Sequence, residues 1–116
     1  EALAQVKGFD DLYRSITGCE PSKLYRPPSS EWSERSLAFV QNLGYRIYLF
    51  SWSHKDWLVD DQPEAQAVLQ RMKSQVFPGS TFMLHSVSDT NVAILEAFIV
   101  YVKEQGYQFA LLPAGN

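Results

Sequence analysis

Three polar residues with complementary chemistry follow short apolar stretches of the chain. Arg26 ends an extended run, Asp56 lies in a polar loop beside Trp57, and His85 ends the apolar run at 81–84. An imidazole exchanges a proton near neutral pH, and a carboxylate next to it can orient the ring. In parallel α/β folds, functional residues gather where strands end. We therefore interpret these residues as candidates for one functional site.

Each candidate also has a structural interpretation. An arginine before two prolines is often a surface residue, and Asp56-Trp57 is typical of a loop anchored by a tryptophan. A lone histidine such as His85 is more often a hydrogen-bonded core residue. His54, among Ser, Lys and Asp, we interpret as part of the loop surface. The functional interpretation is favoured because three separate strand ends present unlike polar groups.

The elements that must position these residues alternate along the chain. Apolar residues spaced by three and four predict helices over 2–16, 33–43, 63–76 and 94–102, with Ser33 as an N-cap and Pro63 in a first turn. Branched and aromatic runs predict strands at 24–26, 45–52, 81–85 and 107–112. This order favours a single α/β domain over residues 1–116, in which parallel strands alternate with helices. The nearly continuous apolar strands fit a covered sheet or a barrel wall.

The composition narrows the classes of function. Of 116 residues, 46% are hydrophobic, and ten basic against thirteen acidic residues give a formal charge of −3. Nucleic-acid binding needs a concentrated positive face, so we expect no nucleic-acid partner. No apolar run approaches the ~20 residues that cross a bilayer, so we expect no membrane span. Cys19 is the only cysteine, which excludes an internal disulfide and a cysteine-cluster zinc site.

The signatures of several common enzyme classes are absent. The sequence has no Gly-x-Gly-x-x-Gly, no P-loop, no Gly-x-Ser-x-Gly and no His-Glu-x-x-His. His54 and His85 are too far apart in the sequence for a short metal motif. The sequence therefore carries no signature of a dinucleotide-binding protein, a P-loop protein, a serine hydrolase or a zinc protease.

The segments that carry the candidates resemble the polysaccharide deacetylases (carbohydrate esterase family 4), and most of all their sporulation-type peptidoglycan N-acetylmuramic acid and δ-lactam deacetylases. The matching segments are 26–28 (Arg-Pro-Pro), 33–37 (Ser-Glu-Arg-Ser-Leu), 50–52 (Phe-Ser-Trp), 55–57 (Lys-Asp-Trp), 78–80 (Pro-Gly-Ser) and 84–85 (Leu-His). The resemblance covers nearly the whole chain. It implies the C-terminal half of a distorted (β/α) barrel that removes acetyl groups from N-acetylated sugars with a bound divalent metal, commonly zinc.

The resemblance also implies a role for five residues. Arg26 would belong to an Arg-x-Pro motif that walls the substrate groove and helps position the catalytic base. The backbone N–H of Ser29 would help hold the oxyanion of the tetrahedral intermediate. His85 would be the general acid that protonates the leaving amine, Asp56 would orient its imidazole, and Trp57 would pack against the site.

Two motifs of the family are missing. The sequence lacks the Thr-Phe-Asp-Asp that supplies a base and a metal ligand, and the His-x-x-x-His that supplies the other ligands. The chain opens at Glu1 without Met, so we expect a processed protein or a piece of a longer one, with both motifs upstream. Within the motifs present, Ser30 replaces a usual Gly, Ser53 an Asp and Met83 a Leu. The Ser30 change matters because Gly tolerates backbone angles that Ser does not.

Three functions are compatible with these observations. The first is metal-dependent de-N-acetylation of peptidoglycan or a chitin-like polysaccharide, with this chain supplying the general acid and groove wall but no metal ligands. The second is a non-catalytic carbohydrate-contact or interaction module, with Trp32, Trp52 and Trp57 as sugar-stacking candidates. The third is an unrelated open-sheet binding domain, in which the candidate residues would not cluster.

Half of a barrel would have two unpaired sheet edges and an uncovered interior. We therefore expect the chain to pair with the missing N-terminal half or with a second copy of itself. The cell-wall substrates of the family imply an extracytoplasmic or cell-wall-associated location.

We predict that these 116 residues alone bind no catalytic metal and show no deacetylase activity, because the metal-ligand motifs are absent. The measurement is a zinc titration of the chain and of its His85→Ala variant. Zinc binding that disappears in the His85→Ala variant would contradict this prediction.

Overall fold

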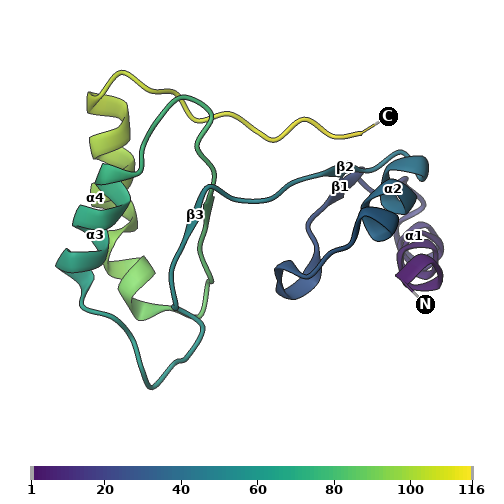
Figure 1. The fold of residues 1–116 in the computed structure, drawn as a ribbon, viewed down its shortest axis with the longest axis horizontal. Helices are drawn as coiled ribbons and strands as arrows, with labels where there is room; N and C mark the ends of the chain where they lie inside the picture. The colour runs from purple at the N-terminus through teal and green to yellow at the C-terminus, as the bar shows by residue number, and fades with distance from the viewer. Residues whose placement is uncertain (1, 116) are drawn as a thin grey trace. The chain divides into compact units, whose positions relative to one another are not determined.

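The computed structural model describes residues 2–115, which form two compact units (Figure 1). The first unit contains residues 2–49 and 111–115, and the second contains residues 50–110. In each unit, helices accompany one pair of short parallel strands. The predicted α/β class, with parallel strands alternating with helices, is confirmed. The prediction of a single domain stays a prediction.

The first unit is built on the parallel strands β1 and β2. Its elements are α1 (Ala2–Thr17), β1 (Leu24–Tyr25), η1 (Pro28–Ser30), α2 (Glu34–Asn42) and β2 (Arg46–Ile47). Helix α2 begins after Ser33, as predicted. The Ser33 side chain accepts the backbone N–H of Ser36 at 3.1 Å, and the Ser36 side chain accepts that of Ser33 at 2.9 Å. This reciprocal capping satisfies two backbone donors at the helix start.

The second unit contains the elements that position Asp56 and His85. They are β3 (Trp52–Ser53), α3 (Ala65–Ser74), β4 (Phe82–Met83) and α4 (Asp89–Glu104). Strands β3 and β4 pair in parallel, with Trp52 opposite Phe82. Because the pair is parallel, the loops that follow both strands leave from the same end.

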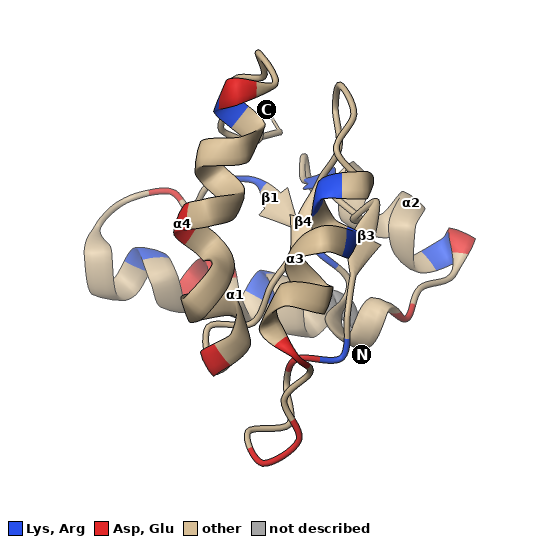
Figure 2. Cartoon of the chain, turned by 90° about the vertical axis from the view of Figure 1, so that its left-hand side faces the viewer, with Lys and Arg blue, Asp and Glu red and all other residues tan. Residues whose placement is uncertain are grey.

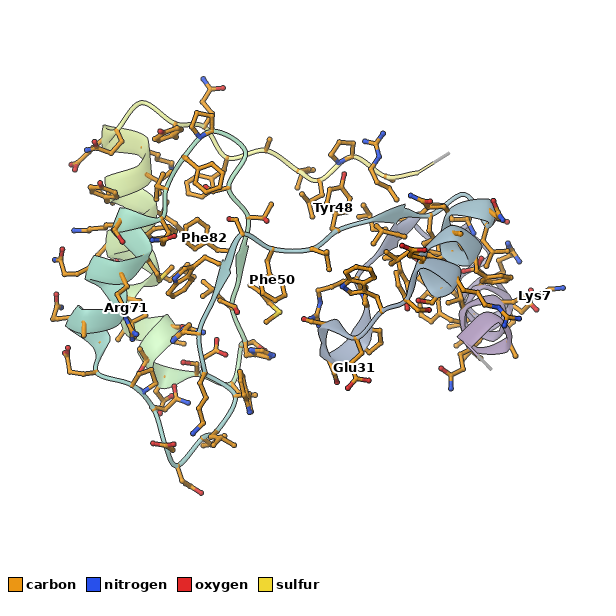
Figure 3. The ribbon with its side chains drawn as sticks, viewed as in Figure 1. Lys7, Glu31, Tyr48, Phe50, Arg71 and Phe82 are labelled. Carbon is orange, nitrogen blue, oxygen red and sulfur yellow. The ribbon has the colours of Figure 1, made fainter. Side chains whose placement is uncertain are left out.

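A hydrophobic core joins α3, α4 and the β3–β4 pair. In Figure 1 the two helices lie together beside the strands, and in Figure 3 Phe82 points toward them. The Phe82 ring centroid is 5.0 Å from that of Phe98 on α4. The buried members of this core are Val68, Leu69, Met72, Ile94, Phe98 and Val102. Burial of each such side chain stabilises the unit by roughly 1.5–3 kcal/mol.

The expected strand at 45–52 is two strands with different partners. Strand β2 pairs with β1, and the Tyr48 N–H continues this ladder to the Tyr25 carbonyl. A few residues later, the Ser51 N–H donates to the Thr81 carbonyl and β3 begins. The aromatic and branched composition is uniform across this run, so it did not reveal the change of partner.

Other boundaries also differ from the expectation, and helix α4 begins at Asp89 instead of residue 94. Residues 107–112 form no strand in the described part of the chain, and the Tyr107 N–H instead donates to the Val102 carbonyl at the end of α4. Pro63 lies before α3, not in its first turn. The Glu64 carboxylate caps the helix by accepting the N–H groups of Gln66 and Ala67 at 2.8 and 2.6 Å.

Charged residues are distributed over several elements. Figure 2 shows Lys and Arg on separate helices and strands, and acidic residues on the loop between β3 and α3. Within residues 2–115, no helix combines the length and the apolar character that a membrane crossing requires.

A buried polar cluster ties α1 to the β1–β2 pair. The Asp10 carboxylate accepts the Tyr45 hydroxyl and lies 2.6 Å from the Lys23 ammonium. That ammonium also lies 4.5 Å from the centroid of the Tyr45 ring. Burial, together with the hydrogen bond to the Asp10 anion, raises the pKa of Tyr45 to about 12.

This cluster predicts a loss of stability at alkaline pH. The Tyr45 phenol ionises near 10 when the chain is unfolded and near 12 when it is folded. The free energy of unfolding should therefore fall between pH 10 and 12, by up to roughly 2–3 kcal/mol. Urea unfolding of the chain and of Tyr45→Phe measures this difference. Tyr13→Phe is the control and should keep the loss, whereas an identical profile for Tyr45→Phe would contradict the prediction.

Candidate active site

Asp56 and His85 meet where the loops after β3 and β4 leave the strand pair. Asp56 Oδ1 is 2.6 Å from His85 Nδ1, and Asp56 Oδ2 accepts the backbone N–H of His85 at 2.8 Å. One carboxylate thus binds both the ring and the backbone of the same histidine. This double contact fixes the orientation of the imidazole.

The Asp56 carboxylate is held as a buried anion. The residue is 0% exposed. Burial acts to raise its pKa, but hydrogen bonds from the His85 backbone, the Asn91 side chain and the His85 ring outweigh it, and the pKa of Asp56 lies below its ordinary value. A negative charge therefore faces His85 Nδ1 at neutral pH.

The His85 ring lies partly open, against Trp57. Its side chain is 35% exposed, and its centroid lies 5.8 Å from that of Trp57 in an edge-on arrangement. Because Nδ1 faces Asp56, the ring nitrogen left for proton exchange with a substrate is Nε2. The structure thus places three predicted site residues, Asp56, Trp57 and His85, together in the second unit.

Asn91 and His54 also belong to this cluster. Asn91 Nδ2 donates to Asp56 Oδ2 at 2.6 Å and to the His85 carbonyl at 3.0 Å. Asn91 Oδ1 is 2.9 Å from His54 Nε2. The interpretation of His54 as loop surface is wrong, because its side chain is 6% exposed and its ring stacks on Trp52 at 5.1 Å.

Two sequence signals could have found these residues. Trp52, His54 and Asp56 are spaced by two, and in extended chain this spacing places side chains on one side. Asn91 comes three residues after Ser88, which caps α4 by accepting the Asn91 N–H at 3.1 Å. A polar residue in the first turn of an apolar helix was therefore a signal of a contact with the loop after β4.

Arg26 and Ser29 lie in the first unit, at the end of β1 and in η1. A common site for them with Asp56 and His85 stays a prediction. Ser29 and Ser30 have φ angles of 53° and 56°, in the left-handed region. Ser30 keeps this backbone although the family usually has Gly there, and a non-glycine residue pays roughly 1–2 kcal/mol for it.

The described residues do not form a metal site. Among residues 2–115, no group of three or more His, Cys, Asp or Glu side chains is placed to hold a metal ion. Hydrogen bonds from His85 and Asn91 reach both oxygens of the Asp56 carboxylate.

Known proteins that are similar to this chain in sequence and fold include a deacetylase. No protein-family model matches the chain. It is 33% identical over 108 residues to an uncharacterized 30.6 kDa protein of Geobacillus stearothermophilus, covering 93% of this chain and 41% of the relative. It is also 33% identical over 100 residues to the peptidoglycan-N-acetylmuramic acid deacetylase PdaA of Bacillus subtilis, covering 86% and 38%.

Solved structures show the same likeness. PdaA, a family 4 carbohydrate esterase, superimposes with a TM-score of 0.77 and 31% identity, over 89% of this chain and 44% of PdaA. A family 4 pseudoenzyme of Bacillus anthracis, BA3943, superimposes with a TM-score of 0.76 over 93% of this chain and 37% of that protein, and at 20% identity it shows the fold alone.

These matches show which proteins the chain is related to. The chain is related over nearly its whole length to the polysaccharide deacetylases of carbohydrate esterase family 4, and it matches the C-terminal half of their barrel fold. It spans about two fifths of the length of the curated relatives.

The burial of Asp56 predicts a large and specific cost for its removal. Asp56→Ala leaves the His85 backbone N–H, His85 Nδ1 and one hydrogen of the Asn91 amide without their acceptor, and should lower the free energy of unfolding by about 3 kcal/mol. Asp61→Asn is the matched control, because Asp61 lies in the same loop but is exposed and pairs with Lys55 on the surface.

The same group predicts an acid dependence. Because the folded pKa of Asp56 lies below 3.8, its contribution is present above that pH and lost as the pH falls through the folded value. Urea unfolding at pH 7 and below pH 4 should show a smaller gap between wild type and Asp56→Ala at the lower pH. A constant gap, or an equal loss in Asp61→Asn, would refute this assignment.

Proposed function

We propose that this chain supplies the general-acid part of an enzyme that removes N-acetyl groups from a cell-wall polysaccharide, either peptidoglycan or a chitin-like glycan. The observation that carries the proposal is the 2.6 Å contact between His85 Nδ1 and a fully buried Asp56 carboxylate. An oriented, partly exposed imidazole is the group that such a reaction needs. The relationship to PdaA supports the choice of amide substrate.

The reaction explains the demand for an acid. A water oxygen adds to the acetamide carbonyl, and the C–N bond breaks. The two products are acetate and a free amino sugar. An amine anion is a poor leaving group, so the nitrogen must receive a proton as the bond breaks. His85 Nε2 delivers this proton, while Asp56 stabilises the imidazolium through Nδ1. General acid catalysis of this kind contributes about 10²- to 10⁴-fold.

The remaining predicted site residues have supporting roles in this proposal. Arg26 walls the substrate groove and helps position the base, and the backbone N–H of Ser29 donates to the oxyanion. Trp57 supports this arrangement by packing its edge against the His85 ring and leaving 52% of its surface exposed to a glycan.

The base and the metal ligands belong to other residues in this proposal. Relatives in this family are metal-dependent, and the described part of this chain offers no metal cluster. The missing half of the barrel, or a second copy of the chain, would supply these groups. A cell-wall substrate would give the protein an extracytoplasmic or cell-wall-associated location.

A second candidate function is glycan binding without catalysis. Trp32 and Trp57 are 55% and 52% exposed, as sugar-stacking side chains must be. Trp52 does not fit this role, because its ring packs against His54 and Phe82.

The two functions are separated by assaying the protein as encoded, with any residues that precede or follow this chain. The assay measures acetate release from peptidoglycan fragments and from chitooligosaccharides. We expect His85→Ala to lower kcat about 10²- to 10⁴-fold, with glycan binding retained. Asp61→Asn is the control and should keep full activity. Glycan binding with no acetate release by the wild type would favour the binding module, and equal activity in His85→Ala would overturn the proposed acid.

A further inference from the structure

We propose that Asn91 is a positioning residue that holds the Asp56 carboxylate against His85 and keeps His54 from competing for it. By doing so, Asn91 determines which nitrogen of His85 carries the proton. The significance for catalysis rests on the proposed function, but the hydrogen-bond arrangement does not.

The direction of the Asn91 amide follows from its partners. Nδ2 lies 2.6 Å from Asp56 Oδ2 and 3.0 Å from the backbone carbonyl of His85. A carboxylate and a carbonyl only accept hydrogen bonds, so the NH₂ group must face both of them. Asn91 itself is 6% exposed, so no bulk water competes for these contacts.

The opposite end of the amide assigns the hydrogen on His54. Asn91 Oδ1 accepts hydrogen bonds only, and the atom that faces it at 2.9 Å is His54 Nε2. Nε2 of His54 must therefore carry a hydrogen. His54 Nδ1 is buried and has no hydrogen-bond partner among the described residues, so nothing there favours a hydrogen on that side.

Two imidazoles stand beside one carboxylate. His85 Nδ1 is 2.6 Å from Asp56 Oδ1, and His54 Nε2 is 3.6 Å from Asp56 Oδ2. At 3.6 Å His54 makes no hydrogen bond to Asp56. His54 Nε2 instead donates to Asn91 Oδ1, while Asp56 Oδ2 accepts the Asn91 amide and the His85 backbone N–H. Without Asn91, a small rotation of either side chain would bring His54 into direct contact with Asp56.

A closed ring of hydrogen bonds holds Asn91 in place. The Ser88 hydroxyl caps the Asn91 N–H at 3.1 Å and donates to Gln62 Oε1 at 2.5 Å. Gln62 Nε2 then donates to the Asp56 carbonyl at 3.0 Å. The first turn of α4 and the loop after β3 are thus locked together around the Asp56–His85 pair.

The experiment is long-range ¹H–¹⁵N NMR of the imidazoles, of which the chain has two. Spectra of the unchanged chain are compared with those of Asn91→Leu, His54→Phe and Thr90→Val. Thr90→Val is the matched control, because Thr90 lies beside Asn91 in the first turn of α4. The substitution removes the hydrogen bond from the Thr90 hydroxyl to the Pro63 carbonyl but leaves the Asp56 contacts intact.

We expect neutral His85 in the unchanged chain to occupy one tautomer, with a slowly exchanging Nδ1–H signal. Asn91→Leu should lose this signal and populate both tautomers, while Thr90→Val should keep it. His54→Phe, which preserves the stacking on Trp52, should broaden the signal because Asn91 Oδ1 loses its donor.

Several outcomes would overturn the proposal. A neutral His85 protonated on Nε2 in the unchanged chain would do so without any variant. A folded Asn91→Leu chain with the wild-type His85 signal would also do so, as would equal loss of the signal in Thr90→Val. If Asn91→Leu does not fold, an unbroadened signal in His54→Phe overturns it.

Activity provides a separate readout. In an active protein, Asn91→Leu should lower kcat about 10- to 100-fold with little change in KM, because it misplaces the acid and not the glycan. If the NMR changes occur but the protein as encoded, with any residues that precede or follow this chain, releases no acetate, the proposed function fails and the positioning role stands. Activity together with unchanged NMR signals gives the reverse conclusion.

Discussion

The buried negative charge of Asp56 is the constraint on which the second unit depends. A carboxylate removed from water is costly unless hydrogen bonds replace its hydration. Here the donors come from the backbone and ring of His85 and from the amide of Asn91. The loop after β3, the end of β4 and the start of α4 must therefore stay in register. Stability and the orientation of the imidazole have the same physical origin.

The rest of the second unit makes this arrangement rigid. The two strands are only two residues long, so their ladder alone could not hold the loops. The core residues of α3 and α4 pack against Trp52 and Phe82, one from each strand, and this packing sets the separation of the strand ends. Ser88 and Gln62 then connect the helix start to the loop. The His85 imidazole keeps its orientation although it is partly exposed, because these packing contacts and hydrogen bonds fix the residues that hold it.

The relationship to the polysaccharide deacetylases agrees with this physical picture but does not replace it. A pseudoenzyme shares the fold at a similar TM-score, so the fold by itself does not establish catalysis. What distinguishes them is the chemistry of individual side chains. In this chain the Asp56–His85 contact fixes the orientation of a partly exposed imidazole, as the proposed acid role requires.

Local patterns in the sequence determined the four helices, the Ser33 cap, the parallel α/β class and the choice of Asp56, Trp57 and His85, because periodicity, capping and motif order act over short distances. The tertiary structure decided which strands pair, and it divided the run at 45–52 between two partners. It also brought in Asn91 and His54, whose roles depend on contacts across 35 and 37 residues of chain. A hydrogen bond between distant residues leaves no local periodicity, so only the folded chain could reveal it.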